Sequence, residues 1–151
     1  MSNQTIGKVA AIAVRGASGR PMQEVIEAAA VADGSLDGDG RHEPDRGITL
    51  ISSRQLEQVN RELGTDLPWH TRRANILVEA EGLGDLIGRT IAIGEVVVDI
   101  KDETRPCGLM DKFHLGFRAA LTPHRRAGVH GRITTGGRIR VGDVVRVREG
   151  D

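Results

Sequence analysis

Aromatic residues are scarce in this chain, which has two phenylalanines, one tryptophan and no tyrosine among 151 residues. The core must therefore be built from aliphatic side chains. Without aromatic pairs the chain also lacks a platform on which nucleic-acid bases could stack. Its 21 lysines and arginines are balanced by 21 aspartates and glutamates, so the formal net charge is zero. A general nucleic-acid binder gains affinity mainly from excess basic charge, so we expect no nucleic-acid partner.

Long apolar runs and paired cysteines are also missing. No stretch approaches the length of a membrane span. The first five residues lack the charged-then-apolar pattern of a signal peptide. The one cysteine cannot form an internal disulfide, which suits a reducing compartment. These features predict a cytoplasmic protein with no membrane partner.

What the chain has in abundance is glycine, with 20 residues, and short apolar segments between turn signals. In the clearest of these segments, Val96, Val98 and Ile100 alternate with other residues, as expected of a half-buried strand. The pattern predicts one mainly-β domain over residues 1–151, an antiparallel or mixed β-barrel with one or two short helices. The expected strands cover residues 7–14, 47–51, 75–78, 91–93, 95–100, 129–133, 138–141 and 144–147.

The most secure helix follows the second strand. Ser52 or Ser53 can cap its N-terminus, and Gly64 suits the position after its last residue. Residues 110–121 predict one or two further short helices, and residues 22–31 have helix-forming composition.

The remaining segments read as loops and turns. Residues 32–46 predict a long irregular loop, and loops of that length are often functional. Gly136-Gly137 predicts a hairpin turn between strands 129–133 and 138–141, and Val141-Gly142-Asp143 a tight turn in which Asp143 bonds its own backbone.

Cys107 stands in the turn Thr104-Arg105-Pro106-Cys107-Gly108. Proline cannot donate to a sheet ladder, so the strand before it should end near Arg105. Arg105 and Lys101 bring positive charge, which favours the reactive thiolate. The alternative is that a lone cysteine is a small buried hydrophobe, which is the commoner case for such a residue.

Two other groups of polar residues are candidates for a site. Arg72-Arg73-Ala74-Asn75 places two guanidinium groups and an amide just before a strand, and arginine suits forked binding of phosphate or carboxylate. The second candidate is His42, which lies in the long loop. The alternative for the arginine cluster and for His42 is that they are ordinary solvated surface residues. No two histidines have the spacing of a zinc site with Cys107.

Taken in order, several segments resemble the MOSC domain, the C-terminal module of molybdenum-cofactor sulfurases that also occurs in small stand-alone bacterial proteins. Residues 34–41, with Met22, resemble the family's glycine-rich acidic loop, and residues 46–52 its "R-x-x-T-L-I-S" strand. Arg73-Ala74-Asn75-Ile76 and Arg105-Pro106-Cys107 resemble its arginine–asparagine and cysteine segments. Glycine-rich stretches at 82–94 and 128–145 complete a match over about residues 8–148.

The resemblance implies a β-barrel of the pyruvate-kinase-barrel type, in which residues 22–31 are extended or loop rather than helix. It implies that Cys107 carries sulfur as a persulfide or ligates molybdenum, and that Arg73 and Asn75 lie on the cofactor side. It also raises Arg105, Arg41 and His42 as cofactor-binding candidates. The cofactor implied is molybdopterin; pyridoxal phosphate binding is a further property at the level of the family.

Three functions follow as hypotheses. In the first, the protein is a sulfur carrier or molybdenum-cofactor module with a cysteine desulfurase or a molybdoenzyme as partner. An alternative within it is molybdenum-dependent reduction of N-hydroxylated compounds together with partner proteins, as in some relatives. In the second, the barrel binds a pterin or another anionic metabolite without chemistry. In the third, barrel edges pair in a homodimer and the pocket has no role.

Overall fold

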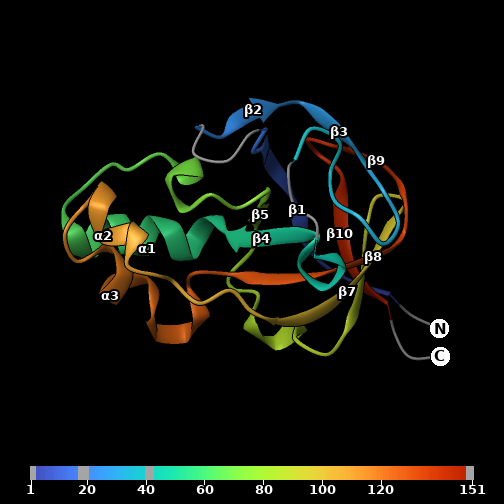
Figure 1. Cartoon of the computed structure of the whole chain (residues 1–151). Coiled ribbons are helices and arrows are strands. Elements are labelled where there is room, and N and C mark those ends of the chain that lie inside the picture. The colour runs from blue at the N-terminus through green and yellow to red at the C-terminus, as the bar shows by residue number, and fades with distance from the viewer. Residues whose placement is uncertain (1–2, 17–20, 40–42, 149–151) are drawn as a thin grey trace.

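A ring of seven strands forms the body of the protein in the computed structural model, which describes residues 3–16, 21–39 and 43–148. The ring runs in the order β10-β6-β7-β8-β4-β5-β1 and closes because β1 also pairs with β10 (Figure 1). Only the β4–β5 pair in this ring is parallel. The strands are β1 (Asn3–Val14), β4 (Ile48–Ser52), β5 (Ile76–Glu79), β6 (Thr90–Ile93), β7 (Val96–Glu103), β8 (Val129–Thr135) and β10 (Val144–Arg148). The predicted mainly-β barrel is confirmed.

Residues 22–31 form two short strands rather than the helix that their composition favours. β2 (Gln23–Val25) pairs with the end of β1, and β3 (Glu27–Ala30) pairs with β9 (Gly137–Arg140) in a separate two-stranded sheet. Ala28 and Ala30 are buried on one face of β3. The pairing with distant strands overrides a weak local helix propensity, so the extended conformation implied by the family resemblance is confirmed.

The predicted hairpin at Gly136-Gly137 is wrong, because the two strands that flank it do not pair with each other. β8 pairs with β7 and β4, whereas β9 crosses over to β3. Glycine is needed at position 136 because the chain passes close to β3 there: a Cβ atom would lie 2.7 Å from the carbonyl oxygen of Ala30. The next turn is as predicted, since the Arg140 backbone N–H donates to Asp143 Oδ2 at 2.8 Å.

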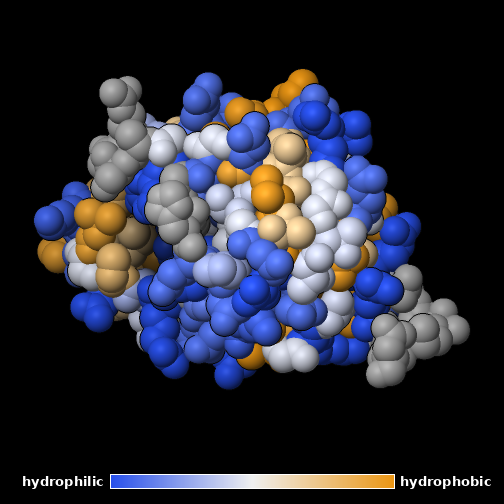
Figure 2. Space-filling model, turned by 45° about the vertical axis from the view of Figure 1, so that its right-hand side comes forward, coloured by the Kyte–Doolittle hydropathy of each residue, from blue (hydrophilic) through white to orange (hydrophobic). Residues whose placement is uncertain are grey.

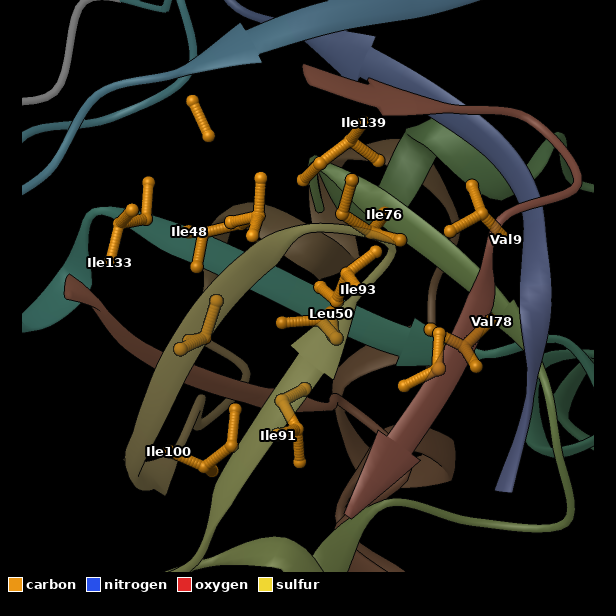
Figure 3. Close-up of a cluster of buried hydrophobic side chains, with 14 of the residues drawn as sticks. Val9, Ile48, Leu50, Ile76, Val78, Ile91, Ile93, Ile100, Ile133 and Ile139 are labelled. Atoms are coloured by element: carbon orange, nitrogen blue, oxygen red, sulfur yellow. The ribbon is translucent and has the colours of Figure 1, made fainter. Parts of the chain in front are cut away.

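The barrel interior is aliphatic, as the composition requires. Branched side chains from all seven ring strands and from β9 meet inside it, including ten labelled residues that are each at most 1% exposed: Val9, Ile48, Leu50, Ile76, Val78, Ile91, Ile93, Ile100, Ile133 and Ile139 (Figure 3). Shape-matched aliphatic packing of this kind makes a rigid barrel, and it leaves polar chemistry to the loops and helices outside it.

Three short α-helices lie together beside the barrel (Figure 1): α1 (Ser53–Leu63), α2 (Leu109–Phe113) and α3 (Phe117–Leu121). The predicted cap is confirmed, because Ser52 Oγ accepts from the Gln55 backbone N–H at 3.2 Å and Gly64 has a φ of 66°. Four single-turn 3₁₀ helices complete the fold: η1 (Pro44–Arg46), η2 (Trp69–Arg72), η3 (Gly84–Leu86) and η4 (Pro123–Arg125). Among the described residues, no helix is long and apolar enough to cross a membrane.

The surface is mostly hydrophilic on the face seen in Figure 2, with hydrophobic residues in small separate groups. The large hydrophobic side chains that are exposed lie in the β2–β3 and β9 region and around α2: Ile26, Val31, Val141, Leu109, Phe113 and Leu115. The long loop at 32–46 is irregular over its described residues, except for an isolated bridge between Ala30 and Leu36 and the turn η1.

Candidate functional site: an arginine-lined thiol cavity

Cys107 lines a cavity of about 260 Å³, together with residues from η1, β4, η2 and α2. We call it the thiol cavity. Five arginines line it with the thiol. Arg15 follows β1, Arg46 ends η1, Arg72 and Arg73 lie at the end of η2, and Arg105 follows β7. Thr49 and Thr104 add hydroxyl groups. Segments that are far apart in the sequence therefore converge on one cysteine.

Cys107 is held at the junction of β7 and α2, and its side chain is exposed. β7 ends at Glu103, after which Thr104 still donates its N–H to the Gly128 carbonyl at 2.8 Å. Pro106 is buried, and the Cys107 carbonyl accepts the first hydrogen bond of α2 from Met110 at 3.0 Å. An exposed thiol on an anchored turn is unlike the buried hydrophobic cysteine that the sequence left as an alternative.

Arg72 anchors the cysteine segment from the side of η2. Its side chain is 7% exposed, and it donates from Nε to the Ala127 carbonyl at 3.0 Å and from Nη2 to the Thr104 carbonyl at 3.1 Å. These bonds tie η2 to both ends of the α2–α3 region. Arg72 therefore positions the cavity wall that carries Cys107.

Arg73 is half-buried and has an unusual backbone, with a φ of 68°. A left-handed conformation costs a non-glycine residue about 1 kcal/mol or more, and such residues cluster at functional sites. Burial and the positive charge of Arg15 lower the pKa of Arg73, and the negative charge of Asp39 offsets part of this effect. The Arg73 guanidinium therefore lies in a partly desolvated, electropositive position where an anion would relieve the repulsion.

The side chains of Arg15 and Arg46 have no ion-pair partner among the described residues. Arg105 is exposed and approaches the carboxylate of Glu103 only to 3.9 Å. No acidic residue lines the thiol cavity in the described part of the chain. The cavity thus concentrates positive charge around one thiol, although the protein as a whole is neutral.

Asn75 does not line the thiol cavity; it lies fully buried behind it. Its Oδ1 accepts from the Thr49 N–H at 3.0 Å and from Thr49 Oγ1 at 3.1 Å. Its Nδ2 donates to the Ala13 carbonyl at 3.1 Å and to Asp39 Oδ1 at 3.3 Å. Asp39 Oδ1 in turn accepts from the Arg15 N–H at 2.8 Å. Asn75 is therefore a positioning residue that fixes β1, β4 and the long loop relative to each other.

The structure brings together Cys107, Arg73 and Arg105 in one cavity, with Asn75 supporting it. Arg41 and His42 lie outside the described residues. Lys101 lies on β7 and does not line the cavity. Sequence reasoning did not assign Arg15 or Arg46 to the site, although the arginine that opens the "R-x-x-T-L-I-S" motif is Arg46.

Groups of three or more histidine, cysteine, aspartate or glutamate side chains that could hold a metal ion do not occur in the described ranges. Cys107 would therefore be a single protein ligand to a metal that arrives with other ligands of its own.

Fold and site together define a small closed barrel that carries one exposed thiol in an arginine-lined cavity. The family model for the MOSC domain matches residues 37–146, and the chain therefore belongs to the MOSC family. No curated protein matches the sequence. The family is associated with the molybdenum cofactor.

Solved structures share the fold at low sequence identity. The YuaD protein from Bacillus subtilis superposes with a TM-score of 0.80 at 16% identity, over 99% of this chain and 99% of that one. YiiM from Geobacillus stearothermophilus has a TM-score of 0.71 at 15% identity, over 98% of this chain and 76% of that one. YiiM from Escherichia coli has a TM-score of 0.68 at 15% identity, over 100% and 71%.

Proposed function

We propose that this protein uses Cys107 as a sulfur carrier or as a ligand to the molybdenum cofactor, in cofactor sulfuration or metal–sulfur transfer. The observation that carries the proposal is the convergence of five arginines on one exposed thiol in the thiol cavity. A persulfide sulfur and the phosphate of a cofactor both carry negative charge, which nearby guanidinium groups attract. The anchored turn presents the sulfur to an incoming partner without a large movement of the fold.

The residues present fit the anionic end of a pterin cofactor. Arg15 and Arg46 have no ion-pair partner among the described residues, and a phosphate would also relieve the repulsion between Arg15 and Arg73. The cavity volume of about 260 Å³ is just below the range of pockets that enclose whole drug-sized ligands. Arg15, Arg46 and Arg73 would thus hold the phosphate and Cys107 the metal. When bound, the cofactor supplies the redox chemistry of molybdenum.

A direct test is sulfur loading. The purified protein is incubated with a cysteine desulfurase and cysteine, and its intact mass and peptide map are measured. The desulfurase persulfide gives its outer sulfur to the Cys107 thiolate and leaves as a thiolate, so the expected product carries one added sulfur on Cys107. Cys107→Ser should take up none, and Arg46→Gln should take it up more slowly.

The second test is cofactor retention after expression in a host that synthesises the molybdenum cofactor. Metal and pterin content of the purified protein should exceed that of Cys107→Ser. If the protein neither gains sulfur nor retains the cofactor, the proposal is wrong.

A binding module without chemistry is the second candidate, and it is supported by Arg15 and Arg46, whose side chains have no ion-pair partner among the described residues. In that case the arginines supply nearly all of the affinity for an anionic ligand. Cys107→Ser would then leave the affinity for a pterin phosphate unchanged, whereas Arg15→Gln and Arg46→Gln would each weaken it.

A further inference from the structure

A second and larger cleft of about 920 Å³ lies on the other side of the cysteine segment from the thiol cavity. Arg105 lines both hollows, and Pro106 lines the cleft while Cys107 faces the thiol cavity. The cleft walls come from η3, η4, α3 and the end of β7. Its volume is in the upper part of the range for small-molecule sites. The function proposed above does not use this cleft.

Charges of both signs line the cleft, and most of them already have partners. Glu103, whose side chain is 19% exposed, lies between Arg105 at 3.9 Å and Arg125 at 4.0 Å. Glu81 lies 3.3 Å from Arg54. Glu103 is thus shared by the two arginines nearest the cysteine segment, and this group keeps one positive charge in excess.

Two opposite charges in the cleft have no such partner in the described part of the chain: the carboxylate of Asp85 on η3 and the guanidinium of Arg118 on α3. They also form no ion pair with each other, so more than 4.0 Å separates their charged atoms. A ligand that satisfies both carries a cationic and an anionic group separated in space, such as an ammonium and a carboxylate. Free amino acids and short peptides are molecules of this class.

The cleft walls are held in a fixed shape. Gln55 Nε2 donates to the His124 carbonyl at 3.0 Å and so ties α1 to η4. His124 and Arg125 adopt left-handed backbones, with φ of 55° and 54°, although neither is glycine. Two consecutive residues of this kind cost folding energy, and the surrounding packing must hold them. Because these walls are already ordered, a ligand that binds between them costs less conformational entropy.

We propose that this cleft is a binding site for a small zwitterion of the amino-acid or short-peptide class, whose carboxylate pairs with Arg118 and whose ammonium pairs with Asp85. Both side chains are exposed, so each contact is weak and the affinity for a simple zwitterion is roughly millimolar. The bound zwitterion then occupies the same cleft that Arg105 and Pro106 of the cysteine segment line.

The test uses triglycine as the probe and ¹⁵N-labelled full-length protein, with binding followed by backbone amide shifts. We expect saturable shifts at residues 84–86 and 117–122. Two capped probes isolate each charge: N-acetyl-triglycine lacks the ammonium, and triglycinamide lacks the carboxylate. Each should bind about two- to fivefold more weakly than triglycine.

Variants provide the second arm. Asp85→Asn and Arg118→Gln should each weaken triglycine binding by about fivefold, because both side chains are exposed and bonded to nothing that the fold needs. Asp66→Asn and Lys8→Gln remove the same charges at exposed positions outside the cleft and should leave the affinity unchanged. Cys107→Ser should also bind triglycine normally, which separates this proposal from the sulfur-carrier function.

Two results would overturn the proposal. Equal binding of triglycine and N-acetyl-triglycine, with no effect of Asp85→Asn, would make the cleft a site for anions only. Absence of saturable shifts around Asp85 and Arg118 up to high millimolar triglycine would mean that the cleft binds no zwitterion.

Discussion

Replacement of Asn75 by alanine tests how the thiol cavity is held in place. The Asn75 side chain is 0% exposed and makes four hydrogen bonds, two to Thr49, one to the Ala13 carbonyl and one to Asp39. The substitution leaves the buried Thr49 N–H and Ala13 carbonyl without these partners. Each such group costs about 1–3 kcal/mol, and a small cavity adds to this cost.

We therefore expect Asn75→Ala to lower the free energy of unfolding by about 3–5 kcal/mol, a large share of a typical total of about 5–15 kcal/mol. The assay is urea unfolding, followed by circular dichroism and by the fluorescence of Trp69, the only tryptophan. A loss of less than about 1 kcal/mol would refute the reasoning, because it would mean that water replaces the amide without penalty.

Asn60 supplies a matched control. Its side chain also makes several hydrogen bonds, to Thr65 at 2.8 Å and to the N–H and carbonyl of Leu67 at 3.0 and 3.1 Å, but the residue is only half-buried at the end of α1. Water can reach groups that Asn60→Ala exposes, so this variant should lose only about 1–2 kcal/mol. A similar loss of unfolding free energy at both positions would show that burial does not determine the cost of removing the amide.

Asn75→Asp adds a pH dependence to the same test. The introduced carboxyl group would be buried and would face the carboxylate of Asp39, so both burial and like charge would raise its pKa in the folded state. A group whose pKa is higher in the folded than in the unfolded state favours folding at low pH. The stability gap between this variant and the wild type should therefore narrow as pH falls from 8 towards 5. A gap that does not change with pH would contradict the assigned contact.

Three further predictions concern the charge, the thiol and the backbone of the site. Arg15→Gln and Arg46→Gln should each weaken binding of inorganic phosphate about tenfold, measured by calorimetry; unchanged affinity would place the anion elsewhere. Native Cys107 should prefer anionic iodoacetate over neutral iodoacetamide more than free cysteine does, by about threefold for each arginine near the thiol, and loss of Arg15 and Arg46 should remove much of that preference. Gly128→Ala should cost at least about 2 kcal/mol in urea unfolding, because its φ is 99° and a Cβ would collide with the β4 backbone; Gly88→Ala, with a φ of 84° and nothing within 4 Å, should cost only about 1 kcal/mol.

Short-range sequence patterns predicted the features that depend on interactions between residues close in the sequence. Alternation in Val96, Val98 and Ile100 marks a strand with one buried face, and Ser52 and Gly64 mark the two ends of α1; the structure confirms both. The lack of aromatic residues implied an aliphatic core, which is what fills the barrel. The cysteine segment was identifiable because Pro106 and Gly108 surround the only thiol.

Strand pairing could not be read from the same signals. Gly136-Gly137 has the composition of a hairpin turn, yet β9 pairs with β3, more than a hundred residues earlier in the chain. Residues 22–31 favour a helix by composition, and only this distant partner makes part of them a strand. Both errors have the same cause: a local preference of a few tenths of a kcal/mol yields to pairing and burial, which local sequence does not record.

By itself, the sequence determined that this protein is a glycine-rich β domain of neutral charge with a single cysteine, because composition and short-range patterns are enough to specify these properties. The tertiary structure alone decided what surrounds the thiol. Arg15, Arg46 and Arg73 are scattered over almost sixty residues, and only closure of the barrel gathers them around Cys107. It also decided that Asn75 supports the site from behind, because hydrogen bonds of a buried amide depend on which strands the fold places beside it.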